Sequence, residues 1–98
     1  LRRTELRVRN QAQMNIREKV AYAFVYYNEA FGTNPKTKTL NVELSRQDIA
    51  DAAGTTAEQV TRQLSNFESE KMIFRKKRAI QLLNIKGLED IVKDYKIE

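Results

Sequence analysis

Two short helical patterns separated by a glycine constrain this chain more than any other feature. The first begins at Ser45, where Asp48 completes a capping box that satisfies the free amides of a starting helix. Gly54 follows, and glycine accepts the positive φ that ends a helix sharply. The chain then restarts at Thr55 or Thr56, either of which can cap a second helix. This stretch therefore predicts two helices joined by a tight turn, the form of a helix-turn-helix.

The second helix carries apolar residues on one face and short polar residues on the other. Val60, Leu64 and Phe67 recur at steps of four and three residues, which predicts a buried stripe. Glu58 or Gln59 is placed to complete a second capping box. The opposite face can reach base edges in a DNA groove. It consists of Ala57, Glu58, Thr61, Arg62 and Ser65. Taken on capping and periodicity alone, the pattern fits an αα-corner of any small helical domain equally well.

A cationic stretch between two apolar runs follows the second helix. Residues 72–74 and 79–83 are rich in β-branched and apolar side chains, which predicts two strands joined by a tip at residues 75–78. A hairpin with a cationic tip after such a helix is a wing, whose cations would meet DNA phosphates. A solvated turn is less favoured, because consecutive cations repel one another. The cations are Lys71, Arg75, Lys76, Lys77 and Arg78.

Composition excludes several classes of function. The 98 residues suffice for one domain with a single modest core. The chain has no cysteine and no histidine, which excludes disulfides, thiol chemistry, a catalytic triad and an ordinary zinc site. No apolar run approaches the ~20 residues of a membrane span, and nothing resembles a signal peptide. We therefore expect a soluble cytoplasmic module that is not an enzyme and binds no metal. Its net charge of +5 favours a polyanionic partner.

The remaining segments predict further helices and one strand. Residues 15–31 form one amphipathic helix whose aromatic stripe belongs to the core. Residues 39–44 alternate apolar and polar side chains, which predicts a short strand that joins the hairpin in a small antiparallel sheet. A last helix covers residues 87–95, and residues 1–13 are basic and helix-compatible. The stripe of the first helix consists of Ile16, Val20, Ala23, Phe24, Tyr27 and Phe31, with Tyr22 and Tyr26 outside its centre.

The predicted order is helix, strand, helix, turn, helix, strand, tip, strand, helix. This is a winged helix-turn-helix, a mainly α (α+β) fold with a small antiparallel sheet. The sequence resembles the carboxy-terminal DNA-binding domain of the Crp–Fnr family of bacterial transcription regulators. The residues that carry the resemblance are Ser45-Arg46-Gln47-Asp48-Ile49-Ala50, Gly54, Glu58, Val60, Arg62, Leu64, Phe67-Glu68 and Met72-Ile73. It covers residues 40–92 firmly and 14–31 more loosely.

The resemblance implies a domain organisation and a mode of binding. Residues 14–98 would be the winged helix-turn-helix, preceded at 1–13 by the end of a dimerisation helix or linker. A homodimer would place its recognition helices, at about residues 56–69, in major grooves ~34 Å apart on a palindrome with TGA/TCA-type half-sites. The wing at 75–78 would bind phosphates. RNA polymerase would be a further partner, and a small-molecule effector would bind the sensor domain, which this sequence lacks. The chain begins with Leu1 rather than Met, so we expect it to be a piece of a longer protein.

The resemblance also assigns roles to single residues. Glu58 matches the position that accepts from cytosine, Arg62 the position that contacts guanine, and Thr61 a third base-contacting position. The wing tip lacks the glycine that many members carry. The expected phosphate contacts are Ser45, Arg46, Gln47, Thr56, Gln59, Lys76, Lys77 and Arg78.

One alternative is a winged helix that binds another protein and no specific DNA sequence. Glu58 and Arg62 would then be an ordinary i,i+4 ion pair on the surface of a helix. DNA binding is favoured because an interaction module does not need this pair, the capped turn and the basic wing together.

Overall fold

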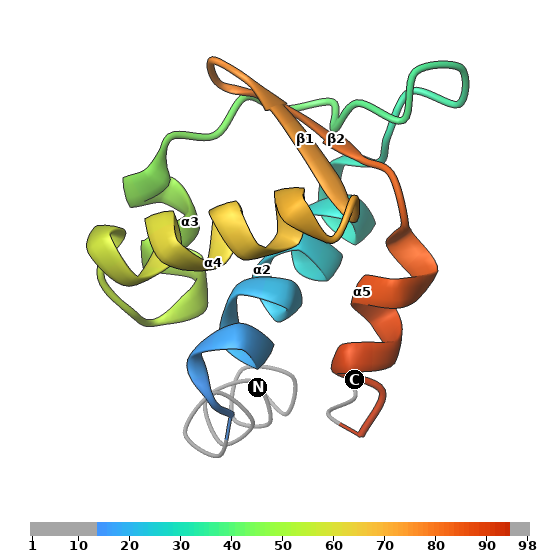
Figure 1. The fold of residues 1–98 in the computed structure, drawn as a ribbon. Coiled ribbons are helices and arrows are strands. Elements are labelled where there is room, and N and C mark those ends of the chain that lie inside the picture. The colour runs from blue at the N-terminus through green and yellow to red at the C-terminus, as the bar shows by residue number, and fades with distance from the viewer. Residues whose placement is uncertain (1–13, 95–98) are drawn as a thin grey trace.

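The computed structural model describes residues 14–94, which form four helices and a two-stranded antiparallel sheet (Figure 1). The elements are α2 (Ile16–Phe31), α3 (Arg46–Ala53), α4 (Ala57–Ser69), β1 (Ile73–Lys76), β2 (Ala79–Leu82) and α5 (Ile85–Ile91). The fold is a winged helix-turn-helix, as predicted. The expected end of a dimerisation helix, at residues 1–13, lies outside the described residues.

Helix α2 runs through the centre of the domain. It begins with a capping box in which the Asn15 side chain accepts from the Glu18 amide at 2.8 Å and the Glu18 carboxylate accepts from the Asn15 amide at 3.0 Å. Every residue of 20–25 is buried, because α3, α4 and α5 all pack against this helix. The predicted stripe is therefore wrong at two positions. Tyr22 is only 1% exposed, whereas Phe31 at the end of the helix is 51% exposed.

Residues 39–44 run beside the hairpin but do not form the predicted strand. The Leu40 amide donates to the Ile80 carbonyl at 2.8 Å, yet this segment makes only isolated bridges. The chain bends at Asn41, whose amide donates to the Gly32 carbonyl at 3.0 Å. That bend ties the segment to the end of α2 and interrupts a regular ladder with β2.

The wing hairpin has a shorter loop than the sequence predicted, because β1 extends to Lys76. Lys76 pairs with Ala79, so the loop consists of Lys77 and Arg78 alone. Arg75 and Lys76, which we expected in the tip, belong to β1. Lys77 has a φ of 58°, in the left-handed region that favours glycine.

The last helix begins earlier than the sequence predicted. Asn84 caps it by accepting from the Gly87 amide at 3.0 Å, so α5 starts at Ile85 and ends at Ile91. Leu88 is buried against the core, as expected. Of the predicted range 87–95, the final residue lies outside the described residues.

Candidate nucleic-acid interface

The first half of the helix-turn-helix follows the predicted chemistry. The Ser45 hydroxyl accepts from the Asp48 amide at 3.1 Å, and the Asp48 carboxylate accepts from the Ser45 amide at 2.9 Å. The hydrogen bond that the Ser45 amide donates to the Asp48 carboxylate is the main cause that holds the pKa of Asp48 below its ordinary value. Gly54 ends α3 with φ 76° and ψ 40°, and its amide donates to the Ala50 carbonyl at 2.8 Å. The turn therefore depends on a residue that adopts the left-handed conformation without a steric penalty.

The second half begins at Thr56, whose hydroxyl accepts from the Gln59 amide at 3.2 Å. The reciprocal bond from position 59 is not formed, so the predicted second capping box is only half present. The predicted stripe of Val60, Leu64 and Phe67 is buried. Burial of this face leaves the opposite side of α4 open to solvent.

The three predicted base-contacting residues differ in their exposure and in their hydrogen bonds. The side chains of Glu58 and Arg62 are 81% and 70% exposed, and Arg62 Nη2 lies 3.6 Å from Glu58 Oε2. Thr61 is half-buried, and its hydroxyl donates to the Ala57 carbonyl at 3.0 Å. Thr61 can therefore accept a hydrogen bond but has already used its donor within α4.

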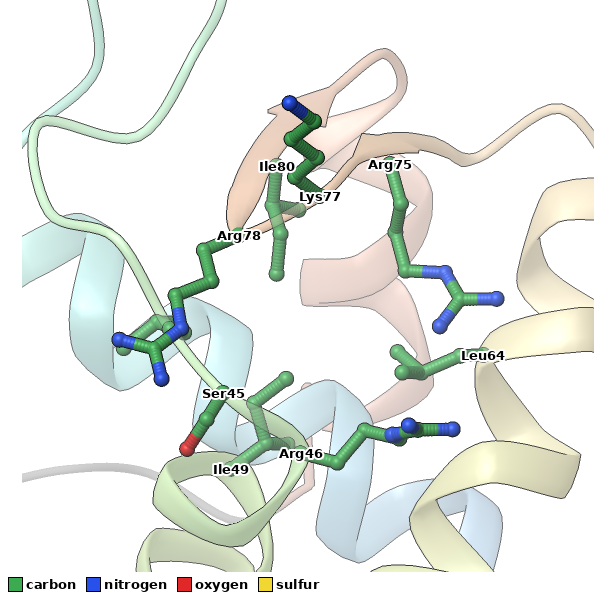
Figure 2. A pocket seen from close by; sticks show the side chains of 9 residues that line it. Ser45, Arg46, Ile49, Leu64, Arg75, Lys77, Arg78 and Ile80 are labelled. Carbon is green, nitrogen blue, oxygen red and sulfur yellow. The ribbon is translucent and has the colours of Figure 1, made fainter.

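A hollow of about 370 Å³ lies between the start of α3, α4 and the wing (Figure 2). Its floor is apolar and includes Ile49, Leu64 and Ile80. Figure 2 shows the guanidinium group of Arg78 extending from the hairpin toward Ser45, while Lys77 points away from the floor. The cationic side chains that line the hollow are Arg46, Arg75, Lys77 and Arg78.

The hollow gathers four of the eight predicted phosphate contacts: Ser45, Arg46, Lys77 and Arg78. Thr56 and Gln59 lie instead at the start of α4. Gln47 donates its side-chain amide to Asp51 at 2.9 Å. Lys76 lines a separate hollow beside the wing with Glu43.

Two ion pairs at the end of α4 were not predicted from the sequence. Arg75 donates to both carboxylate oxygens of Glu68, at 3.1 and 3.2 Å, and this contact lowers the pKa of Glu68. Arg17 donates to both oxygens of Glu70, at 2.7 and 2.9 Å, and its guanidinium carbon lies 4.7 Å from the centroid of the Phe67 ring. Arg75 lies seven positions from Glu68, and Arg17 lies 53 positions from Glu70. The two residues of each pair belong to different parts of the fold, so no local spacing rule could have predicted either pair.

Residues 14–94 contain neither a cluster of potential metal ligands nor a membrane-spanning helix. They hold no cluster of three potential metal-ligating side chains. None of the helices in residues 14–94 combines the length and the apolar character needed to cross a bilayer.

Comparison with known proteins shows that residues 18–91 match a family described as the Crp-like helix-turn-helix domain. A CRP/FNR-family transcriptional regulator from Thermus thermophilus has a similar solved structure, with a TM-score of 0.79, 24% identity, and coverage of 92% of this chain and 46% of that one. FixK2 from Bradyrhizobium japonicum gives a TM-score of 0.75 at 25% identity, over 89% and 43% of the two chains. The chain thus spans less than half the length of these structures. No curated protein sequence matches it.

Proposed function

Because this chain belongs to the Crp-like helix-turn-helix family, whose members are DNA-binding transcription regulators, we propose that it reads a specific double-stranded DNA sequence with α4 in the major groove. One observation carries the proposal. Glu58 and Arg62 stand together on the exposed face of α4, beside a hollow lined by cations. A base-reading pair next to a phosphate-binding surface is the arrangement that a sequence-specific DNA-binding domain needs.

The chemistry of the pair matches a TGA/TCA-type half-site. Arg62 can fork onto the O6 and N7 atoms of guanine, while Glu58 can accept from the N4 amino group of cytosine. The free protein loses little when the two side chains separate, since an exposed i,i+4 pair contributes only about 0.2–0.5 kcal/mol. Each good base contact discriminates by about 1–3 kcal/mol, so exchange of partners favours the DNA complex. Thr61 contributes as a hydrogen-bond acceptor, because its own proton is bound within the helix.

The cationic hollow supplies the sequence-independent part of the affinity. A phosphate seated between Arg46 and Arg78 would also lie near the Ser45 hydroxyl, which can donate a hydrogen bond to it. Lys76 and Lys77 add contacts from the wing, and Gln47, Thr56 and Gln59 add contacts from the starts of α3 and α4. Each phosphate that is neutralised makes binding more sensitive to salt.

In the whole protein, we propose that two copies bind a palindrome, with residues 14–98 of each copy as the DNA-binding domain and residues 1–13 as the end of the dimerisation helix. The two recognition helices would then lie about 34 Å apart on one face of the duplex. A regulator of this kind acts on the chromosome in the bacterial cytoplasm, where RNA polymerase is its partner. Any small-molecule effector would bind outside residues 14–98.

Fluorescence anisotropy tests the proposal with a duplex carrying a TGA…TCA palindrome and a scrambled duplex, each at two salt concentrations. We expect tighter binding to the palindrome and weaker binding to both duplexes at higher salt. Arg62→Ala should abolish the preference while leaving most of the non-specific affinity. Lys86→Ala is the matched control, because it removes the same charge from α5 and should keep the preference.

Two results would contradict the proposal. Absence of binding to any duplex at low salt would leave the protein-interaction alternative. An Arg62→Ala protein that still separates the palindrome from the scrambled duplex would remove Arg62 from the base-reading surface.

A further inference from the structure

The wing is joined to α4 by a sharp turn, and its β2 side is held to residues 38–44 by backbone hydrogen bonds. Lys71 adopts a φ of 63°, and the Met72 amide donates to the Phe67 carbonyl at 2.9 Å. Ile73 and Leu82, paired at the base of the hairpin, are both buried. This packing anchors the base, and at the tip the Arg78 carbonyl accepts from the Leu44 amide at 3.0 Å, just before α3 begins.

One polar contact ties the middle of the hairpin to α4. Among the described residues, the side chains of Glu68 and Arg75 make the hydrogen bonds that join the two strands to this helix. The pair is bidentate, with Arg75 Nη2 3.1 Å from Glu68 Oε1 and Arg75 Nε 3.2 Å from Glu68 Oε2. Its side chains are only 28% and 31% exposed. A planar fork of this kind fixes both distance and orientation, which a single contact does not.

Arg75 lies on the inner side of the hairpin although it belongs to a run of four cations. It pairs with Ile80 across the ladder, and Ile80 is buried in the core. Residues paired across an antiparallel ladder point to the same face. Figure 2 shows the Arg75 side chain extending toward α4, unlike that of Lys77.

We propose that Glu68 and Arg75 are positioning residues that hold the wing at a fixed distance from α4, and that Arg75 contacts no phosphate itself. The inference rests on the proposed function. With the pair intact, Lys77 and Arg78 meet the DNA backbone at the same time as Glu58 and Arg62 enter the groove. Without it, β1 loses its side-chain hydrogen bonds to α4, so the spacing between wing and helix must be fixed on binding, which lowers affinity. The pair also neutralises the Glu68 carboxylate, which would otherwise repel phosphates.

A reciprocal charge swap separates positioning from phosphate contact. Arg75→Gln should weaken binding to the palindrome about three- to tenfold, within the range that one ordinary hydrogen bond contributes, with the salt slope unchanged. The double variant Glu68→Arg/Arg75→Glu keeps the net charge and reverses the pair. It should restore affinity to within about twofold of wild type, because only the relative geometry matters. If Arg75 instead bound a phosphate, the swap would place a carboxylate there and bind more weakly than Arg75→Gln.

Lys76→Gln is the matched control, since it removes a cation from the adjacent, outward-facing position of β1. It should reduce the magnitude of the salt slope by about 0.9, the signature of one lost phosphate contact. Arg75→Lys provides a second test that does not depend on the swap folding. A lysine keeps the charge but cannot form the fork, so it should bind as weakly as Arg75→Gln.

The outcomes are distinguishable when thermal unfolding is measured for every variant. Recovery in the swap, together with weak binding by Arg75→Lys, supports the inference. It is overturned if Arg75→Lys binds like wild type, if Arg75→Gln lowers the salt slope, or if Arg75→Gln changes nothing. If wild-type protein binds no duplex at low salt, the proposed function fails first and this inference fails with it.

Discussion

Replacing Lys77 with glycine should stabilise the domain and weaken its DNA binding at the same time. Lys77 is the first residue of the two-residue wing loop and has a φ of 58°. The left-handed conformation costs an L-residue about 1–2 kcal/mol, a strain that glycine does not experience. Glycine also gains conformational freedom in the unfolded chain, which offsets about 0.4–1 kcal/mol of that stabilisation. The net gain is therefore about 0.5–1 kcal/mol, or a rise of about 4 °C in the Tm of a domain of this size.

Lys77→Ala is the matched control for this experiment. It removes the same ammonium group but keeps a Cβ in the strained position, so it should not raise the Tm. Both variants should lose the same phosphate contact and reduce the magnitude of the salt slope by about 0.9. Differential scanning calorimetry and anisotropy titrations at several salt concentrations measure the two effects on the same preparations.

Two results would contradict these expectations for Lys77. If Lys77→Gly and Lys77→Ala unfold at the same temperature, the backbone at Lys77 is not strained in solution. If their salt slopes equal that of wild type, Lys77 does not meet the DNA backbone.

Two further predictions concern stability. Gly54→Ala should lower the free energy of unfolding by about 1 kcal/mol, because alanine must adopt the left-handed turn at φ 76°. Gly54→Asn should lower it less. Equal stability of wild type and both variants would contradict this account. Arginine partners lower the pKa of Glu68 and Glu70 from the ordinary value of 4.5, so their stabilising contribution is complete above that pH and is lost as the pH falls through the lowered values. The Tm of Glu68→Gln/Glu70→Gln should therefore fall less than that of wild type between about pH 5 and about pH 3. Glu89→Gln, at an exposed position of α5, serves as control, and parallel curves for all three proteins would refute the assignment.

The features that were predicted correctly from the sequence depend on residues that lie close together in the chain. Ser45 and Asp48 of the capping box are three positions apart, and the left-handed turn needs only Gly54 itself. The buried stripe of α4 was predictable because that helix packs through one face. Tyr22 was placed wrongly because α2 is covered on several sides, a condition that no periodicity within the helix records. Residues 39–44 failed as a strand because Asn41 binds the distant end of α2.

The candidate site shows the same division between local and distant chemistry. The pattern of consecutive cations identified the wing, but it could not say which cations the fold itself uses. Arg75 is paired with Glu68, which leaves Lys76, Lys77 and Arg78 as the exposed charges of the hairpin. The hollow that joins Arg46 to Arg78 brings together residues 32 positions apart. The helix-turn-helix and the wing are therefore separate motifs in the sequence but a single cationic surface in the structure.

Two glutamates of helix α4 pair with arginines, Glu58 with Arg62 of the same helix and Glu68 with Arg75 of β1, and the geometry explains why only the first pair suits base reading. Glu58 and Arg62 touch through a single contact at 3.6 Å, with more than two-thirds of each side chain in solvent. Glu68 and Arg75 form a bidentate pair with less than a third of each side chain exposed. A solvated single contact exchanges its partner at little free-energy loss, whereas a half-buried fork leaves an unpaired charge when it opens. The same two residue types thus supply a changeable contact at the start of the recognition helix and a fixed one at its end. The proposed mode of DNA binding uses both, because a base contact must be made anew on the DNA while the distance between helix and wing must already be set.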